Sequence, residues 1–397
     1  MRRIGCSDMA FYHKETRNLR IQVLLKEKVN IDILKAAVRD ALYDFKEYAV
    51  SLEFKDSTLY YRDNDRDVLI CPDDPTERYL GTEDTNGYLF YILYGEDYFT
   101  VSFFHGLTDF YGMYGFIKNV LYYYAVSFRN EVADIRTPEV PQDDEERYDP
   151  YTKFKDADAK QWLYTDDSEI FKIPMDKIDS GEHSQHEYLI HISTHKFIEL
   201  THQWETTFIP ALVSITSDMI SEMYGAKDEA VVVKVPADMR GIFDTKTRVN
   251  FSDALVLSTT KEIRKCSMKE QCHRLRNMMD EQLTRDNLKK LMAGGVKLPE
   301  LTYALTYPGK MDLPEDYDFL VEDFKLKAFV PVDSIRLSVK TTKDDMTISM
   351  AQAFDSPEIA RKLVETLKGY GFDPVLEDLG RFGGDRYSIE RIKETKA

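Results

Sequence analysis

The sequence predicts an α/β fold, of the α+β kind, built from two similar halves in which helices pack against mixed sheets. Strand-like segments rich in aromatic and β-branched residues alternate with amphipathic helical segments. The same order of elements then recurs after an acidic, proline-containing stretch at residues 130–182. We therefore expect a first half at residues 1–165 and a second half at residues 166–397, the latter with the crossover segment and a polar C-terminal tail.

The first half contains clear helix and strand signals. Asn30 is a helix N-cap residue, and Leu34, Val38 and Phe45 recur at helical spacing behind it. The elements expected here are a short helix at 9–12, a strand at 20–25, the helix from Ile31, a hairpin at 51–61, a strand at 68–70, a hairpin at 88–104 and a helix ending near Phe128.

The second half repeats this pattern. The elements expected are a strand at 188–193, a helix from His195 capped by Thr194, a helix at 209–224, strands at 229–235 and 251–257, a mostly helical region at 259–292, closing antiparallel strands at 327–332, 335–340 and 346–354, and a helix at 357–368 ended by Gly369. The acidic run at 143–146 is typical of a solvated linker. From about Val375 onward we expect only a polar tail.

Composition narrows the class of protein. The chain has 397 residues, enough for two cores, and 43% apolar content favours a globular protein. Its formal net charge of −17 argues against nucleic acid or an anionic membrane as the main partner. No apolar run is long enough for a membrane span, and no secretory signal follows Met1. We expect a cytoplasmic protein without integral membrane association; the oligomeric state is not readable.

Neither the cysteines nor the histidines predict a metal site. Cysteine stands at positions 6, 71, 266 and 272 without zinc-like spacing, which indicates reduced, mostly packed thiols. Histidines at 183, 186, 191 and 195 crowd together, but no carboxylate or thiol stands at ligand spacing beside them. We expect no bound metal.

The candidate catalytic stretch is Ser102–Gly112. A run of strand-forming residues, Tyr98–Phe104, delivers His105 to a turn, and a helical pattern follows. Asp109 stands four residues after the histidine. A base mounted at the mouth of a loop between rigid elements suits catalysis. The pattern H-x-x-x-D is weak alone, and a histidine that only satisfies backbone groups at a strand end is the alternative.

This stretch resembles a motif of the acyl-CoA-dependent acyltransferase superfamily, which includes chloramphenicol acetyltransferase, nonribosomal-peptide condensation domains and alcohol O-acetyltransferases. Residues Phe104–Phe110 lie on the family's H-H-x-x-x-D-G signature. His105 matches the second, catalytic histidine, and Asp109 matches the aspartate. Phe104 replaces the first histidine and Phe110 replaces the glycine, so the match is partial.

Two further segments are similar to the same family. Val235–Arg240 followed by Thr247–Phe251 resembles its "V-P-x-x-x-R … N-F" segment. The turn at Thr306–Gly309 stands where relatives carry "S-N-x-G", with Tyr307 in place of asparagine. The resemblance implies two halves that meet along a cleft. It also implies that acceptor and acyl-coenzyme A, a co-substrate and not a permanently bound cofactor, enter from opposite faces and meet at the histidine.

The implied reaction is transfer of an acyl group, most simply acetyl, from a coenzyme A thioester to a hydroxyl or amine. His105 would act as general base, because an unperturbed imidazole titrates near neutral pH. By resemblance, Asp109 braces the loop by pairing with an arginine of the second half. Arg240 is the candidate, with Arg248 and Arg20 as alternatives. The candidate substrate or oxyanion donors are Thr108, Asn250, Ser252 and Tyr307.

Two alternative functions stay open at this point. The phenylalanines at 104 and 110 are compatible with a catalytically weakened member that binds a ligand or a protein. A condensation-type enzyme that uses a carrier-protein thioester is the other alternative. The acceptor and the acyl chain length are not readable, although the Tyr and Phe content is compatible with an apolar or lipid-like acceptor.

Overall fold

The computed structural model describes residues 2–3, 18–56, 58–76, 78–129, 134–136, 140–155, 169–174, 184–294, 300–328, 335–354, 356–383 and 391–392. The helix predicted at 9–12 and the predicted boundary between residues 165 and 166 lie outside these ranges, so both stay predictions. Within the described residues, no helix is long and apolar enough to cross a membrane.

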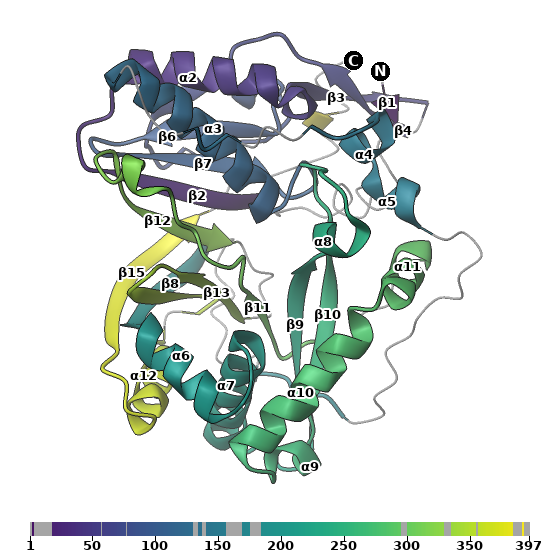
Figure 1. The fold of residues 1–397 in the computed structure, drawn as a ribbon, viewed down its shortest axis with the longest axis vertical. Helices are drawn as coiled ribbons and strands as arrows, with labels where there is room; N and C mark the ends of the chain where they lie inside the picture. The colour runs from purple at the N-terminus through teal and green to yellow at the C-terminus, as the bar shows by residue number, and fades with distance from the viewer. Residues whose placement is uncertain are drawn as a thin grey trace.

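A five-stranded mixed sheet with the order β12-β2-β7-β6-β5 is the centre of the first half. Helices α2 and α3 cover one face of this sheet, and a small sheet β1-β4-β3 lies beside it (Figure 1). The elements are β1 (Arg2–Arg3), β2 (Asn18–Leu25), α2 (Ile31–Asp44), η1 (Lys46–Tyr48), β3 (Val50–Lys55), β4 (Thr58–Asp63), β5 (Ile70–Pro72), η2 (Glu83–Thr85), β6 (Phe90–Tyr94), β7 (Tyr98–Phe104), α3 (Phe110–Phe128), α4 (Asp144–Tyr148) and α5 (Pro150–Phe154).

The second half contains a seven-stranded mixed sheet with the order β10-β9-β11-β13-β14-β8-β15. Helices α6, α7, α10 and α12 cover its outer face, away from the first half (Figure 1). The elements are β8 (Ser184–Ser193), α6 (Thr194–Gln203), α7 (Phe208–Tyr224), β9 (Val231–Asp238), α8 (Arg240–Phe243), β10 (Ser252–Thr259), α9 (Lys261–Arg264), α10 (Met268–Gln282), α11 (Arg285–Gly294), β11 (Tyr303–Thr306), η4 (Glu315–Tyr317), β12 (Val321–Ala328), β13 (Ile335–Thr341), β14 (Asp345–Gln352), α12 (Glu358–Gly369) and β15 (Val375–Gly383).

The predicted fold class is therefore confirmed: two mixed sheets, each flanked by helices. The helix after Asn30 begins as predicted, because the Asn30 side chain accepts a hydrogen bond from the Ile33 amide. The capping residue of α6 is Ser193 and not Thr194, one residue earlier than predicted.

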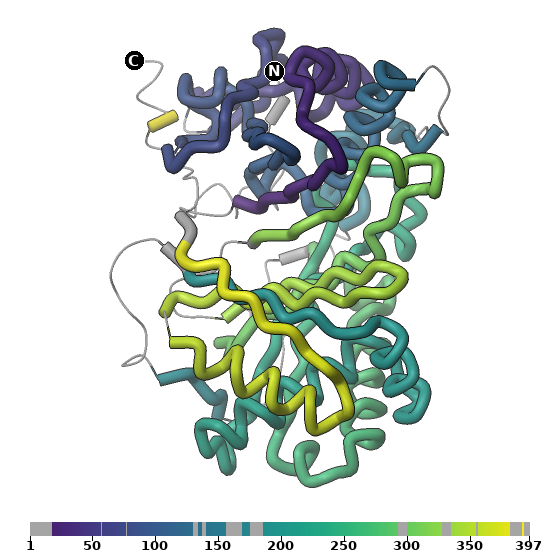
Figure 2. The backbone as a smooth tube through the Cα atoms, turned by 90° about the vertical axis from the view of Figure 1, so that its left-hand side faces the viewer, coloured from purple at the N-terminus to yellow at the C-terminus, as the bar shows by residue number. Residues whose placement is uncertain are grey.

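Strand β12 corrects one prediction. The sequence suggested a closing strand at 327–332, of which residues 329–332 lie outside the described residues. Lys327 and Ala328 belong to β12, which pairs antiparallel with β2 in the sheet of the first half and not with the other closing strands. Figure 2 shows β12, in green, beside β2, in purple. Alternating apolar residues fit either sheet, so the pattern did not say which sheet the strand joins. Because β12 comes from the second half of the chain, its pairing with β2 connects the two halves.

The C-terminal segment corrects another prediction. Residues Val375–Gly383 were expected to be a polar tail, but they form β15, which pairs antiparallel with β8. This edge strand is largely exposed, so it lacks the apolar alternation by which a strand is usually predicted. Strand β11 was also missed; it is short and runs parallel to both β9 and β13.

The acidic run at 143–146 is only partly the solvated linker that its composition suggested. Glu146 is buried and its carboxylate accepts hydrogen bonds from the Thr245 hydroxyl and from the Lys246 amide, 2.6 Å away. Lys153 also contacts this carboxylate, at 3.3 Å. Helix α4 therefore anchors the loop that follows α8.

Candidate active site

His105 stands directly after β7, which is paired on both sides by β2 and β6. The five residues of the loop end at Asp109, the N-cap of α3. Gly106 is required in this loop, because a Cβ there would lie 2.4 Å from the ring of Phe104. A central strand and a capped helix thus fix both ends of the segment that carries the histidine.

The histidine is half-buried, and its surroundings disfavour the charged form. Burial lowers the pKa of His105 to about 4. A hydrogen bond to its own backbone and the charge of Asp109 act in the opposite direction, whereas the positive charges of Arg336 and Lys234 lower the pKa further. The imidazole is therefore neutral at physiological pH, which is the form that accepts a proton.

Asp109 uses its carboxylate for structure. Oδ1 accepts a hydrogen bond from the Gly112 amide at 2.9 Å, which caps α3. Nη2 of Arg240 lies 3.0 Å from Oδ1 and 2.9 Å from Oδ2, and the Phe251 amide donates to Oδ2 at 3.0 Å. The structure thus brings Asp109 and Arg240 together, and this carboxylate braces the loop that carries His105.

Arg240 connects the loop of His105 to the second half. Its guanidinium also donates to Asp238 Oδ1 at 2.7 Å and to the carbonyls of Thr247 and Val249 at 2.8 and 2.7 Å. Burial alone would lower the pKa of Arg240, but the charges of Asp109 and Asp238 more than offset it, so the pKa is raised. The sequence did not indicate Asp238 as a second partner of this arginine.

The segment from Thr245 to Asn250 lies tightly against the first half. The carbonyl of Arg248 accepts hydrogen bonds from Tyr48 and Thr108, both at 2.7 Å. A Cβ on Gly112 would lie 2.0 Å from this carbonyl oxygen, so only glycine permits the approach of α3. The close fit explains why this glycine stands in the first turn of the helix.

Arg248 and Arg20, the alternative partners of Asp109, make other contacts. Arg248 donates to the Asp44 carbonyl at 2.7 Å and lies 3.6 Å from the buried carboxylate of Glu47. Burial raises the pKa of Glu47, and the charge of Arg248 opposes this. Arg20 donates to Ser102 Oγ. Sequence reasoning missed the pair of Arg248 and Glu47, because 201 positions separate the two residues.

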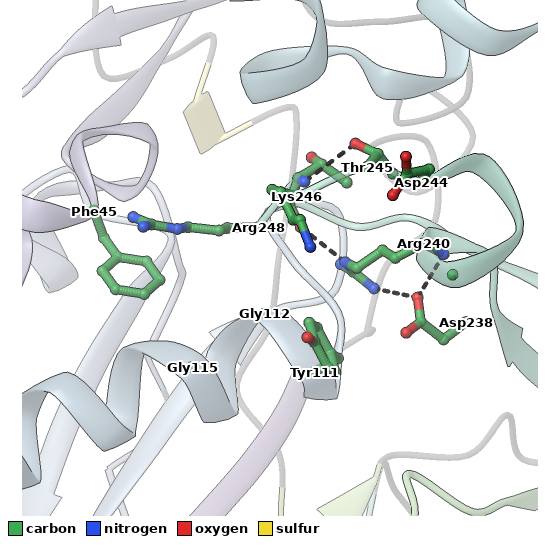
Figure 3. A pocket seen from close by; sticks show the side chains of 12 residues that line it. Phe45, Tyr111, Gly112, Gly115, Asp238, Arg240, Asp244, Thr245, Lys246 and Arg248 are labelled. Atoms are coloured by element: carbon green, nitrogen blue, oxygen red, sulfur yellow. Dashed lines mark hydrogen bonds and ion pairs between the residues drawn. The ribbon is translucent and has the colours of Figure 1, made fainter. Parts of the chain in front are cut away.

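A cavity of about 310 Å³ is lined by Arg240 and by residues of α3 and of the segment that follows β9 (Figure 3). Tyr111, Gly112 and Gly115 of α3 form one wall, and residues 238–248 form the other. The guanidinium of Arg240 lies over the ring of Tyr111, 4.7 Å from its centroid. Three cationic side chains line the cavity against two carboxylates: Arg240, Lys246 and Arg248 against Asp238 and Asp244.

The four candidate oxyanion donors have different environments. The Thr108 hydroxyl is engaged by Tyr48 and the Arg248 carbonyl. Tyr307 lies on the outer face of the seven-stranded sheet, where it stacks on Phe208 and pairs with Thr341, so it is not brought to the brace.

Asn250 and Ser252 lie at the brace itself. Asn250 stands between Val249, which binds Arg240, and Phe251, which binds Asp109. Its side chain is 1% exposed, and Ser252 Oγ donates to its Oδ1 at 3.1 Å. Among the residues that the structure describes, Nδ2 has no hydrogen-bond partner. A buried amide donor without a partner is costly unless it serves a ligand.

The two phenylalanines of the motif are both core residues. Phe104 is fully buried in the first-half core, and its amide donates to the Leu89 carbonyl at 2.9 Å. Phe110 begins α3, and its ring packs edge-on against Phe103 with 6.2 Å between centroids. Both phenylalanines therefore fill the core. Asp109 still caps α3 although the residue after it is phenylalanine and not glycine.

No family model and no curated protein matches this sequence. Solved structures, however, match it over nearly the whole length of both chains. Polyketide synthase associated protein 5 from Mycobacterium tuberculosis aligns with a TM-score of 0.65 at 12% identity, covering 92% of this chain and 97% of its own. F. sporotrichioides TRI101, complexed with coenzyme A and T-2, aligns with a TM-score of 0.64 at 13% identity, covering 96% and 99%.

The starter condensation domain of rhizomide synthetase RzmA also aligns, with a TM-score of 0.61 at 12% identity, covering 93% of this chain and 95% of its own. The chain therefore has the chloramphenicol acetyltransferase-like, two-part fold of these proteins. At such identities the likeness establishes the fold, and the activity must be argued from the site.

Proposed function

We propose that this protein is an acyltransferase that moves an acyl group, most simply acetyl, from coenzyme A to a hydroxyl or amine acceptor. The observation that carries the proposal is the mounting of His105: a neutral imidazole on a loop whose geometry is fixed by the bridge between Asp109 and Arg240. The structural relatives support it, because TRI101 was solved with coenzyme A.

In the proposed reaction His105 takes the proton of the acceptor hydroxyl or amine as the acceptor atom attacks the thioester carbonyl. A tetrahedral intermediate forms, its C–S bond breaks, and the imidazolium returns the proton to the departing thiolate. The products are the acylated acceptor and free coenzyme A. No cysteine is needed as a nucleophile, since both proton transfers use the same base.

Part of the donor would bind at the cavity of Figure 3. The first turn of α3, which lines the cavity, adds partial positive charge there. A volume of about 310 Å³ is at the lower end of ligand-site sizes. These features favour the cavity as the place where part of the donor binds.

We propose Asn250 as the oxyanion donor, because its buried amide nitrogen lies at the brace and is oriented by Ser252 through Oδ1. Asn250→Ala should lower kcat roughly 10²–10³-fold with little change in KM. Ser252→Ala, which removes only the orienting hydroxyl, should lower kcat roughly tenfold. Ser252→Thr keeps a hydroxyl at this position and should therefore retain most of the wild-type kcat. Steady-state kinetics measures these values; an unchanged kcat in Asn250→Ala would contradict the role.

The test of the proposed function is thiol release from acetyl-CoA and longer acyl-CoAs, with a panel of alcohols and amines. We expect acceptor-dependent release by wild type and none by a folded His105→Ala variant. Release that survives in His105→Ala would exclude this base. If no donor releases thiol and coenzyme A does not raise the unfolding temperature, the coenzyme A proposal fails. Turnover with a carrier-protein thioester alone would then establish the condensation-type alternative.

A further inference from the structure

Asn18, the first residue of β2, stands next to the base in the fold. Strands β2 and β7 are antiparallel, so the start of β2 lies beside the end of β7, and Asn18 pairs with Phe104. His105 directly follows Phe104 in the chain. Paired residues of antiparallel strands have Cα atoms about 4.5–5.5 Å apart, and consecutive Cα atoms are about 3.8 Å apart. The Cα atoms of Asn18 and His105 are therefore no more than about 9 Å apart, so one small substrate group can contact both side chains.

Alternation along β2 separates Asn18 from its apolar neighbours. Leu19 and Ile21 belong to the core of the first half, and Asn18 and Arg20 alternate with them. On the adjacent strand the residue opposite Asn18 is Phe104, whose ring offers neither a hydrogen-bond donor nor an acceptor. The cross-strand pair therefore leaves the Asn18 carboxamide to other partners.

The carboxamide of Asn18 is buried, because the residue is only 1% exposed. Among the residues that the structure describes, neither its Nδ2 nor its Oδ1 takes part in a hydrogen bond. The buried carboxamide of Gln282 shows the usual arrangement: Oε1 accepts from the Val256 amide at 2.9 Å, and Nε2 donates to the Val256 carbonyl at 2.8 Å. An unpaired buried amide disfavours folding, since its polar atoms bind water in the unfolded chain. Proteins tolerate this cost at functional sites, where a ligand completes the hydrogen bonds.

The unpaired atoms of Asn18 specify the chemistry of the ligand. A carboxylate only accepts hydrogen bonds and would leave Oδ1 unpaired, whereas an ammonium only donates and would leave Nδ2 unpaired. An amide or a hydroxyl both donates and accepts, so it can satisfy the two ends of the carboxamide. Asn250, by contrast, accepts from Ser252 at Oδ1 and, within the described part of the chain, leaves only Nδ2 unpaired, which suits a developing oxyanion.

Resting on the proposed function, we propose that Asn18 binds a substrate through a neutral amide or hydroxyl group next to the reacting atoms. Either reactant can supply this group. The arm of coenzyme A carries an amide close to its thioester sulfur, and an acceptor can carry a hydroxyl or an amide beside its nucleophilic atom. In both cases Asn18 positions one reactant at His105 and takes no part in proton transfer.

The variant Asn18→Leu separates this role from a structural one. Leucine has a similar branched shape without polar atoms, so it removes the unpaired amide and should leave the unfolding temperature unchanged or raise it. Asn18→Ala removes the amide without adding volume and guards against a packing effect of leucine. The matched control is Gln282→Leu, which deprives the Val256 amide and carbonyl of their partners and should lower the unfolding temperature. A drop as large as that of the control in both Asn18 variants would show a structural amide and overturn the inference.

Binding is measured by calorimetry without turnover, so this readout does not depend on the transfer reaction. The donor probes are coenzyme A and its adenosine bisphosphate part, which lacks the arm. The acceptor probes are propylene glycol against propanol, and glycinamide against ethylamine. We expect both Asn18 variants to raise the Kd of coenzyme A, or of propylene glycol or glycinamide, roughly 10–100-fold, with an unchanged Kd for the partner probe that lacks the group. The probe that loses affinity identifies which reactant Asn18 binds.

The outcomes distinguish this inference from the proposed function. Loss of affinity for one probe of a pair supports the inference even if no donor releases thiol, in which case the transfer reaction alone fails. Unchanged Kd values for every probe in both variants, or no binding of any probe by wild type, would overturn the inference. Thiol release that keeps its wild-type KM values in both variants would also overturn it, and the proposed function would then stand without Asn18.

Discussion

Replacing Asp109 by alanine is expected to lower the free energy of unfolding by about 3–5 kcal/mol, because it leaves a buried arginine short of its partner. The side chains of Asp109 and Arg240 are 9% and 5% exposed. The variant also removes the N-cap of α3 and leaves the Phe251 amide without its acceptor. Urea unfolding followed by circular dichroism measures the change.

A second Arg–carboxylate pair serves as the control. Arg66 and Glu83 form a two-point contact of 2.8 and 3.0 Å, but both side chains are largely exposed. Glu83→Ala should therefore cost only about 0–1 kcal/mol. If Asp109→Ala lowered the free energy of unfolding by a similarly small amount, burial would add nothing to the contribution of the bridge between Asp109 and Arg240.

The double variant Asp109→Leu with Arg240→Met examines the pair as a unit. Its cost should be clearly smaller than the sum of the two single replacements, since each single variant leaves one buried charge and the double variant leaves none. Stability regained in this way should not restore thiol release, because the loop of His105 then loses the contacts that Asp109 makes to the second half. Additive costs would contradict the coupling.

The local elements around the base could be predicted from the sequence. Residues Tyr98–Phe104 are strand formers in an unbroken run, and Asp109 before a helical pattern is a typical N-cap, so strand, loop and helix followed from short-range signals. The arginine that meets Asp109 came from the resemblance of Val235–Arg240 to a family segment. Local pattern alone would not have selected Arg240 over Arg248.

The features that could not be predicted depend on long-range placement. Strand β12 has the alternation of any half-buried strand, and only the tertiary structure assigns it to the first-half sheet. Lys234 did carry a signal, because a lysine interrupts a run of valines at 231–235. That Lys234 and Arg336 lie in one cross-strand row, with Ala304 between them, depends on β11, which inserts in parallel between β9 and β13.

The remaining large effect concerns the pH dependence of the base. A general base must be neutral to accept a proton, and burial, together with the charges of Arg336 and Lys234, lowers the pKa of His105 to about 4. With a neutral acceptor, kcat/KM should therefore be nearly constant from pH 8 to pH 5. A histidine of ordinary pKa would be protonated over this range and would lose roughly 30-fold between those limits. Arg336→Gln should raise the pKa of His105 and move the acidic decline of kcat/KM to higher pH.

His105→Ala completes this test with two readouts. Loss of the base should lower kcat/KM roughly 10²–10⁴-fold across the whole range. The lowered pKa of His105 also makes the free energy of unfolding depend on pH. In the unfolded state the imidazole is protonated near pH 6.5, whereas in the folded state it is protonated only near pH 4. Wild type should therefore lose stability relative to His105→Ala as the pH falls through this window, and the two should run parallel above it. A wild-type kcat/KM that declines below pH 6.5, with no divergence in stability, would show that the imidazole is solvated and not held neutral by its surroundings.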